Sequence, residues 1–257
     1  MTNETPFDRR KFIQLLVGSG VAMAGLKVAR KTRASSSESG PRQWAMVIDL
    51  EKCTGCGYCT KVCQAHNDVP PDIEWNRVTA WGNEENTYYL PQPCMHCKEA
   101  PCVSACPVKA SYYRPDGIVM MDYDRCIGCR YCEAACPYGA RSFNWEKFTD
   151  ENPLVPEWGL PEVERRARGV VEKCSFCYHR IDRGLAAGLT PGVDPQATPA
   201  CVVGCPVGAR TFGDLKDPES AVSKLISTRV VHRLQENLGT EPRVFYIYPN
   251  GEEEVAS

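Results

Sequence analysis

The sequence has 257 residues, of which 30 are Lys or Arg and 32 are Asp or Glu, so its formal net charge is −2 at pH 7. This balance argues against a protein that binds nucleic acid through a basic excess, and it gives no reason to expect an acidic tail. The length suffices for one large domain or two small ones, and the hydrophobic content of 43% is adequate but modest. The 16 cysteines are the outlier, and they indicate either a disulfide scaffold or metal sites.

The N-terminal segment, residues 1–41, is predicted to be an export signal followed by a linker. Arg9 and Arg10 precede a mildly apolar run, residues 12–26, which is short for a membrane span but has the size of a signal-peptide core. The paired arginines resemble the twin-arginine export signal. The segment departs from the usual pattern of that signal at Asp8 and Gln14. The alternative is an amphipathic N-terminal helix. A twin-arginine signal would place the folded chain in the periplasm, on the extracytoplasmic face of the membrane.

The cysteines fall into four groups of four, and the groups are of two alternating kinds. The first and third groups, "CTGCGYCTKVC" and "CIGCRYCEAAC", share one spacing, and the second and fourth share the segments "PCVSACPVKA" and "ACVVGCPVGA". This alternation indicates an internal duplication. The four groups, in chain order, are Cys53, Cys56, Cys59 and Cys63; Cys94, Cys97, Cys102 and Cys106; Cys126, Cys129, Cys132 and Cys136; and Cys174, Cys177, Cys201 and Cys205.

Short strands are expected directly before the first and third groups, in "WAMVIDL" and "GIVMMDY". The second strand belongs to a predicted hairpin, "SYYRPDGIVMMD", with Arg-Pro-Asp-Gly as its turn. Helical turns are expected after the cysteine loops. Residues 137–173 and 178–200 do not repeat and are predicted to be surface excursions, because they are rich in Pro, Gly and charge. They are either solvated loops or docking arms, and Trp145 and Trp158 favour docking, since aromatic residues are enriched at interfaces.

The cysteine spacing favours [4Fe–4S] clusters over disulfides and zinc. Disulfide bridges require no particular spacing, whereas the spacing here repeats. A Cys-x-x-Cys pair is a good half-site for tetrahedral zinc, but the third cysteine of each run would be surplus. A cubane has four iron corners that each bind one thiolate, and Cys-x-x-Cys-x-x-Cys can wrap three of them. Gly55, Gly57 and Gly128 suit the close approach of the backbone to such a cluster.

The ligand sets follow from the resemblance to two-cluster bacterial ferredoxins, in which the fourth cysteine of a run binds the other cluster. The second and third groups are contiguous and resemble one such ferredoxin, and the outer groups would then pair with each other. The four implied sets are Cys94, Cys97, Cys102 and Cys136; Cys106, Cys126, Cys129 and Cys132; Cys53, Cys56, Cys59 and Cys205; and Cys63, Cys174, Cys177 and Cys201.

The expected fold class is α+β, with one ferredoxin-like unit nested inside another. The inner unit would span residues 93–145, and the outer unit would combine residues 42–92 with 146–220. Residues 221–257 would form a C-terminal extension. Four clusters in a line would let electrons pass from one end of the chain to the other.

The chain also resembles a known family, the four-cluster iron–sulfur subunits of molybdopterin oxidoreductase complexes such as tetrathionate, polysulfide and dimethyl sulfoxide reductases. The resemblance rests on all 16 cysteines and on "DGIVMMDYDRCIGCRYCEAACPYGAR", "VEKCSFCYHRI" and "CVVGCPVGARTFGDLKDP". It implies an electron-transfer subunit that is not itself an enzyme. It also implies two partners, a molybdopterin-containing catalytic subunit and a quinone-binding membrane subunit of the polysulfide-reductase type, so the chain would be membrane-associated through its partners. The alternative is a related sulfite-reduction or respiratory complex without a molybdopterin partner.

Two further function classes stay open from the residues alone: an enzyme whose reaction site is a cluster or metal, and a structural zinc protein. The enzyme would need an incompletely ligated iron, and 16 thiols for four cubanes leave none. The same count makes the four histidines packing or surface residues. Of these, His96 lies inside a cysteine loop, where a hydrogen bond to sulfur would influence a cluster potential.

Overall fold

The computed structural model of the protein describes residues 42–83 and 86–249. The predicted export signal and linker, residues 1–41, therefore lie outside the described residues. None of the described helices is long and apolar enough to cross a membrane. Short helices and short strands occur together along the described chain, as the α+β prediction requires.

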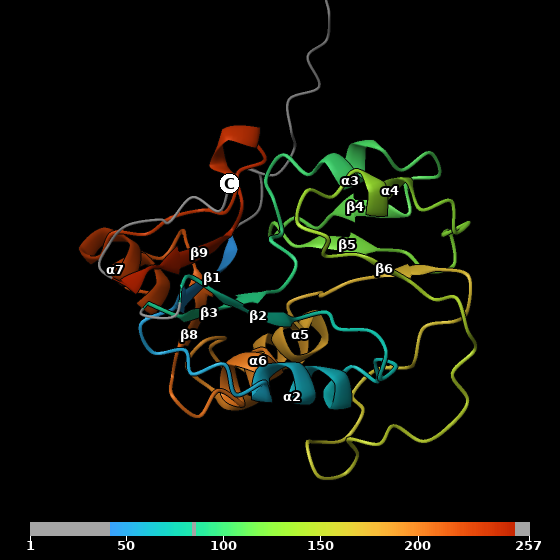
Figure 1. Cartoon of the computed structure of the whole chain (residues 1–257), viewed down its shortest axis with the longest axis horizontal. Coiled ribbons are helices and arrows are strands. Elements are labelled where there is room, and N and C mark those ends of the chain that lie inside the picture. The colour runs from blue at the N-terminus through green and yellow to red at the C-terminus, as the bar shows by residue number, and fades with distance from the viewer. Residues whose placement is uncertain (1–41, 84–85, 250–257) are drawn as a thin grey trace, which may run out of the picture. The chain divides into compact units, whose positions relative to one another are not determined.

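A three-stranded sheet leads into the first cysteine group. Its central strand β1 (Trp44–Asp49) pairs antiparallel with β8 (Arg210–Asp214) and parallel with β9 (Val244–Ile247) (Figure 1). Strand β1 is buried along its whole length and ends just before the cysteine loop that starts at Cys53. The sheet therefore fixes the point from which that loop departs.

Side chains of β1 alternate between two apolar cores, as the period of a β-strand requires. Ala45 and Val47 pack with helix α7 (Ala221–Thr228), and Met46 and Ile48 belong to the main core. Helix α7 begins at a side-chain cap, because the hydroxyl of Ser220 accepts a hydrogen bond from the Ser223 N–H at 3.1 Å. Residues 221–249 thus contribute both α7 and β9 to this sheet layer.

Three two-stranded hairpins connect the cysteine groups, each antiparallel. They are β2 (Arg77–Trp81) with β3 (Tyr88–Gln92), β4 (Ser111–Tyr113) with β5 (Val119–Met121), and β6 (Ser142–Phe143) with β7 (Val171–Glu172). The predicted β4–β5 hairpin is confirmed: the Gly117 N–H donates to the Arg114 carbonyl at 3.0 Å and closes the turn.

The helices are short and pack in pairs. Helix α2 (Tyr58–His66) packs on α6 (Ala200–Val203), and α3 (Pro101–Ser104) packs on α4 (Tyr131–Ala134) (Figure 1). Each of these helices carries cysteines of one group. The helical turns predicted after the first and third cysteine loops are therefore confirmed. The duplication of the sequence appears in the structure as two similar helix pairs.

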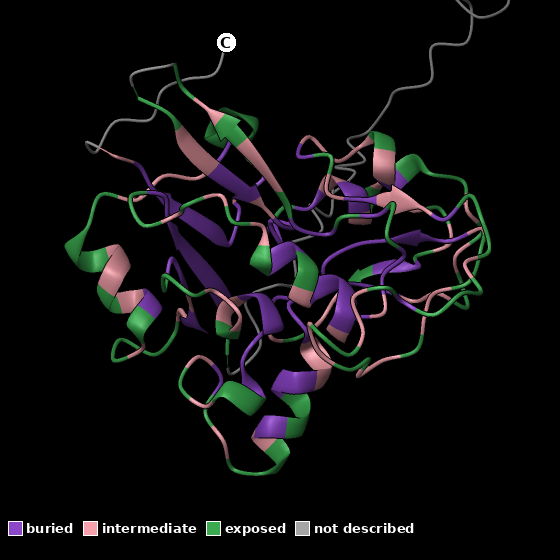
Figure 2. Cartoon of the chain, turned by 60° about the horizontal axis from the view of Figure 1, so that its bottom comes forward, coloured by how far each residue is buried: buried purple, intermediate pink, exposed green. Residues whose placement is uncertain are grey.

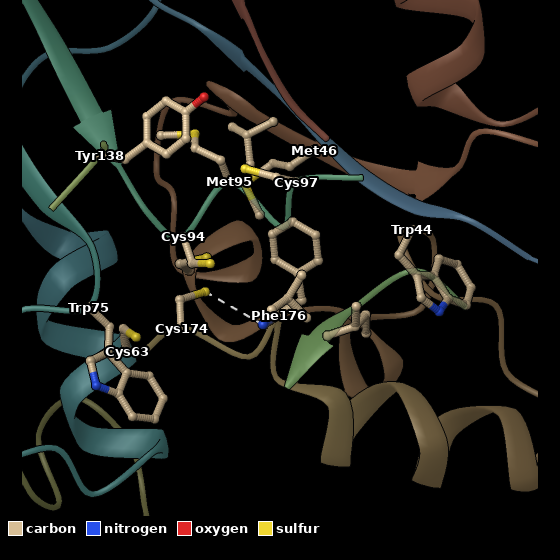
Figure 3. Close-up of a cluster of buried hydrophobic side chains, with 14 of the residues drawn as sticks. Trp44, Met46, Cys63, Trp75, Cys94, Met95, Cys97, Tyr138, Cys174 and Phe176 are labelled. Atoms are coloured by element: carbon tan, nitrogen blue, oxygen red, sulfur yellow. Dashed lines mark hydrogen bonds between the residues drawn. The ribbon is translucent and has the colours of Figure 1, made fainter. Parts of the chain in front are cut away.

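The main core runs between the cysteine loops. Phe176 lies at its centre, with ring centroids 3.8 Å from His96 and 5.4 Å from Phe212 (Figure 3). Trp44 stacks on Phe212, with ring centroids 5.5 Å apart. Strands β1, β5 and β9 are buried along their whole length, whereas β2 contains no buried residue, and burial varies along the chain accordingly (Figure 2). Most cysteines belong to this core, so whatever the thiols bind is surrounded by apolar side chains.

The prediction of surface excursions is wrong for part of the two non-repeating stretches. Residues 178–200 form helix α5 (Tyr178–Ala186) and the short 3-10 helix η2 (Pro195–Ala197), which pack closely, since a Cβ on Gly184 would lie 2.2 Å from the Cβ of Ala197. Within residues 137–173, Asn152 is buried and its amide donates to backbone carbonyls at and beyond the end of α2. Polar and proline-rich composition concealed this burial, because the buried groups are satisfied by hydrogen bonds.

Candidate metal centre

All four cysteine groups begin with the same backbone turn. The residue directly before the second cysteine is left-handed in each case, with φ of 70° at Gly55, 45° at His96, 69° at Gly128 and 53° at Phe176. At Gly55 and at Gly128 an added Cβ would lie 2.3 Å from a neighbouring atom, so those two positions require glycine. The four loops therefore present their first two cysteines in a similar way.

The first group forms a cavity with the last cysteine of the chain. Cys53, Cys56 and Cys59 line this cavity, and Cys205 reaches it from the far end of the sequence together with Arg210. The Ala209 N–H donates to the Cys205 sulfur at 3.3 Å. The four thiols are those of one predicted ligand set.

A second cavity has the same construction. Its thiols are Cys94, Cys97, Cys102 and Cys136, and Arg141 lines it as well. Three of the cysteines come from the second group and one comes from the end of the third group. This is again one complete predicted set.

The predicted set that contains Cys174 is buried throughout. Cys63, Cys174, Cys177 and Cys201 are all buried, and Cys63 interacts electrostatically with the other three. Asn67 bridges two of them, because its amide nitrogen lies 3.6 Å from the Cys177 sulfur and 3.8 Å from the Cys63 sulfur. Figure 3 shows Cys63, Cys94 and Cys174 in one region of the core.

The remaining predicted set, which contains Cys126, is the most open. Cys132 is buried and interacts with Cys106, whereas Cys126 is half-buried and Cys129 is exposed. The Ser111 N–H donates to the Cys106 sulfur at 3.5 Å. The described contacts bring Cys106 to Cys132 but do not by themselves bring all four thiols together.

None of the cysteines in the described residues forms a disulfide, and all 16 are free thiols. Within the same residues, no three His, Cys, Asp or Glu side chains are placed to hold a single metal ion. Two of the four sets line cavities, whereas a zinc site would require four ligands that converge on one point. Burial raises the pKa of Cys97 and of Cys174 to about 12. Such thiols are protonated at neutral pH unless a bound cation holds them as thiolates.

Three buried cations that the sequence analysis did not single out belong to this centre. Arg141 donates to the Cys102 sulfur at 3.0 Å, Arg210 lies 3.7 Å from the Cys201 sulfur, and Lys173 is next to Cys174. A sequence signal for the two arginines exists, since "CPYGAR" and "CPVGAR" follow the same cysteine of their groups. Lys173 carries no comparable signal.

His96 is buried, and it makes no hydrogen bond to a cysteine sulfur among the described contacts. Its Nδ1 accepts the Val119 N–H at 3.1 Å, so the ring proton of the neutral imidazole lies on Nε2, which is buried without a protein partner. Burial lowers the pKa of His96 well below its ordinary value, which keeps the ring neutral. His66 instead joins an ionic cluster with Glu162, at 2.7 Å.

Two tryptophans lie near the sets that contain the exposed thiols Cys129 and Cys56. Trp145 is 59% exposed and packs on Phe143 and under the guanidinium of Arg130. Arg130 lies between Cys129 and Cys132 in the sequence. Trp158 packs edge-on against Tyr58 near the first group. The two tryptophans noted in the sequence are thus both near open cysteine sets.

Comparison with known proteins matches two iron–sulfur families. The "4Fe-4S dicluster domain" family matches residues 85–152, and the "4Fe-4S binding domain" family matches residues 44–65. A selenate reductase subunit of Mesobacillus selenatarsenatis is 41% identical, covering 80% of this chain and 72% of its own length. A tetrathionate reductase subunit of Salmonella typhimurium is 36% identical, covering 93% and 88%. The Hdr-like menaquinol oxidoreductase iron–sulfur subunit 1 of Archaeoglobus fulgidus is 41% identical, covering 95% and 99%.

The chain belongs to the family of iron–sulfur subunits of dimethyl sulfoxide, polysulfide, tetrathionate and selenate reductase-type complexes. This iron–sulfur subunit transfers electrons and is not a catalytic subunit, as predicted. Its cofactors are [4Fe–4S] clusters, carried by two ferredoxin-type domains. The cavities lined by four thiols, with N–H donors aimed at sulfur, fit such a cofactor.

Proposed function

We propose that this iron–sulfur subunit holds four [4Fe–4S] clusters in a row and conducts electrons from one partner protein to another. The observation that carries the proposal is that Cys205 meets Cys53, Cys56 and Cys59 in one cavity, although the chain separates them widely. Three ligands from one loop and a fourth from another loop are the ferredoxin arrangement. Bound clusters supply one-electron carriers, and the chain supplies their ligands and spacing. The four ligand sets are those derived from the sequence.

The nested fold and its domain boundaries belong to this proposal. An inner unit, residues 93–145, would contain the α3–α4 pair, and an outer unit, residues 42–92 with 146–220, would contain the α2–α6 pair. Residues 221–257 would extend the outer unit through β9, which pairs with β1. The packing of equivalent helices in each unit supports this division.

The contacts between sets support one order for the row. Cys132 interacts with Cys102, Cys174 interacts with Cys94, and Cys63 interacts with Cys59. If each ligand set is named after one of its cysteines, the order is therefore the Cys126 set, the Cys94 set, the Cys174 set and the Cys53 set. The two middle sets are mostly buried, whereas the end sets contain the exposed thiols Cys129 and Cys56. Electrons would enter and leave at those two ends.

The end of the row at Cys129 offers an apolar surface for a partner protein. Ile127 and Tyr131, both 64% exposed, surround Cys129 in sequence and offer an apolar docking surface together with Trp145. One end would meet a molybdopterin-containing catalytic subunit and the other a quinone-reactive membrane subunit. The complex would lie on the extracytoplasmic face of the membrane, after export of the folded chain by the twin-arginine route.

A second candidate is a respiratory complex without a molybdopterin subunit. It is favoured by the relative named as an Hdr-like menaquinol oxidoreductase subunit, which matches this chain over nearly its full length. Co-purification of the native complex, followed by a molybdenum assay, separates the two. Molybdenum supports the first candidate, and its absence from an active complex supports the second.

The ligand sets are tested by paired cysteine variants. Cys205→Ser and Cys56→Ser should change the EPR signal of the same cluster, whereas Cys201→Ser should change a different one. All three variants are compared at equal protein concentration, with iron assayed in each. If Cys205→Ser and Cys201→Ser disturb the same cluster, the exchange of the fourth ligand between groups is wrong.

A further inference from the structure

Four cationic side chains are buried without an ion pair among the described residues: Arg243, and three that each lie near two cysteine sets. Arg141, Lys173 and Arg210 are at most 5% exposed. None of them takes part in an ion pair within the described residues. Other buried arginines differ: Arg166 pairs with Glu172, and Arg180 pairs with Glu162. An unpaired charge in an apolar core is unfavourable, so these three cations require a negative charge from another source.

Arg210 lies between two cysteine sets. It lines the cavity of the Cys53 set, and its Nη1 is 3.7 Å from the sulfur of Cys201, which belongs to the Cys174 set. Its Nη2 donates to the Asn76 amide oxygen at 2.7 Å and fixes the orientation of the guanidinium. The neighbouring Met46 sulfur, at 3.5 Å, is uncharged. Arg210 interacts electrostatically with Cys59 and Cys205 on one side and with Cys201 on the other, so it faces both cysteine sets.

Arg141 lies five residues after Cys136, the last cysteine of the third group, as Arg210 lies five residues after Cys205, the last cysteine of the fourth group. It lines the cavity of the Cys94 set and lies 3.0 Å from the Cys102 sulfur, within electrostatic reach of Cys132 in the Cys126 set. The Ser111 hydroxyl accepts from it at 2.6 Å. Its Nε is buried with no protein partner, which leaves donor capacity for a bound group.

Lys173 lies at the remaining junction. Its ammonium donates to the carbonyl oxygens of Val119 and Cys174, the latter at 2.7 Å. It interacts electrostatically with Cys94 and Cys102 of one middle set and with Cys174 of the other. Each gap in the row therefore contains one buried cation that faces the sets on both of its sides.

We propose that Arg141, Lys173 and Arg210 are electrostatic bridges, each stabilising an added electron on both of the clusters it separates. This inference rests on the proposed four-cluster row. Reduction of a cluster site adds one negative charge, and a cation in the gap favours it. An electron that moves from one of these two clusters to the other is close to the same cation before and after the transfer. The electrons come from the reducing partner protein, or from dithionite in the test.

The test is an EPR-monitored redox titration, with dithionite, of the full-length, cluster-loaded chain. Arg141→Gln should lower two of the four potentials, and Arg210→Gln should lower the other two. Lys173→Gln should lower one potential from each pair. Each shift should be at least tenfold in the equilibrium constant for reduction, which is about 59 mV for a one-electron couple. Arg141→Lys and Arg210→Lys, which keep the charge, should restore more than half of the shift.

Two further variants guard against loss of folding. Asn76→Asp and Ser111→Asp keep the arginines but place a carboxylate beside each, and they should lower the same pairs of potentials by a smaller amount. Arg243→Gln is the matched control, since Arg243 is buried but interacts with only one set, through Cys97, and should move at most one potential.

The pattern of shifts decides the outcome. Shifts confined to one cluster for each variant, or no shift with iron content unchanged, would overturn the bridging role. Loss of iron from every variant would also overturn it, because it would assign the cations a role in folding alone. A wild-type chain without four reducible clusters would instead refute the proposed function, so the two failures are distinct.

Discussion

The buried ion pair between Arg166 and Glu172 gives the sharpest stability prediction. The Glu172 carboxylate is completely buried and accepts from Arg166 Nε at 3.1 Å and from Trp75 Nε1 at 3.2 Å. In Glu172→Gln the cation of Arg166 stays buried without its partner. Breaking a buried pair in this way destabilises by about 3–5 kcal/mol. We expect about 3 kcal/mol, because Arg166 keeps the carbonyl oxygens of Asn67 and Asp68 as acceptors.

Native-state hydrogen exchange of the loaded chain measures this loss, since it reports the free energy of local opening. Burial raises the pKa of Glu172, so the experiment is run at about pH 8 to keep the carboxylate ionised. The amides of Asn144 and Gly169, which bond across the β6–β7 region, should exchange about 100-fold faster in Glu172→Gln.

The control is Glu51→Gln. Glu51 forms an ion pair with Arg229, and their side chains are 42% and 41% exposed, so this variant should leave the exchange rates unchanged. The double variant Arg166→Met/Glu172→Gln should recover at least half of the stability lost in Glu172→Gln, because it no longer contains a buried cation without a partner. Exchange less than about threefold faster in Glu172→Gln would refute the reasoning.

Three further predictions concern the core, the ionic cluster and the cofactor. Phe212→Ala should destabilise the chain by about 3–5 kcal/mol in thermal unfolding, because Phe212 is 1% exposed and contacts both Trp44 and Phe176; a loss below about 1 kcal/mol would contradict the packing. Burial acts to raise the pKa of Glu162, but hydrogen bonds and charge from Arg183 and Arg180 outweigh it, so the pKa is lowered from 4.5. The stability that Glu162 contributes is therefore present above 4.5 and lost as the pH falls through the lowered value; protection of its amide, which bonds to His66, should fall there in the wild type and not in Glu162→Gln. Iron extraction with a chelator should make buried thiols such as Cys63 and Cys177 reactive to labelling, because metal binding and folding are coupled; thiols that stay protected would show that the scaffold is stable without metal.

The cysteine loops could be predicted because the spacing of their cysteines allows one loop to bind several iron atoms of the same cluster. Gly55 and Gly128 also follow from the sequence, since the turn before the second cysteine needs a left-handed residue. At the equivalent positions His96 and Phe176 adopt the same turn without glycine, and no local signal identifies them. There the tertiary packing of the two rings, 3.8 Å apart, imposes the conformation.

Long-range pairing was the part that the sequence did not provide. Strand β9 pairs with β1 in parallel, and this neighbour relation depends on the whole chain rather than on any local pattern. The burial of Lys173 was equally hidden, because a lysine beside a cysteine loop is ordinarily solvent-exposed. Lys173 is buried because the loops at Cys94 and Cys174 converge on it.

The central claim is that these thiols hold four cubane clusters that carry electrons. Its most direct measurement is the iron and acid-labile sulfide content of the anaerobically purified full chain, together with bleaching of its visible absorption by dithionite. The account predicts about 16 iron and 16 sulfide per chain, with bleaching that reverses on reoxidation. A colourless, zinc-containing protein, or about half that iron with every thiol intact, would contradict it.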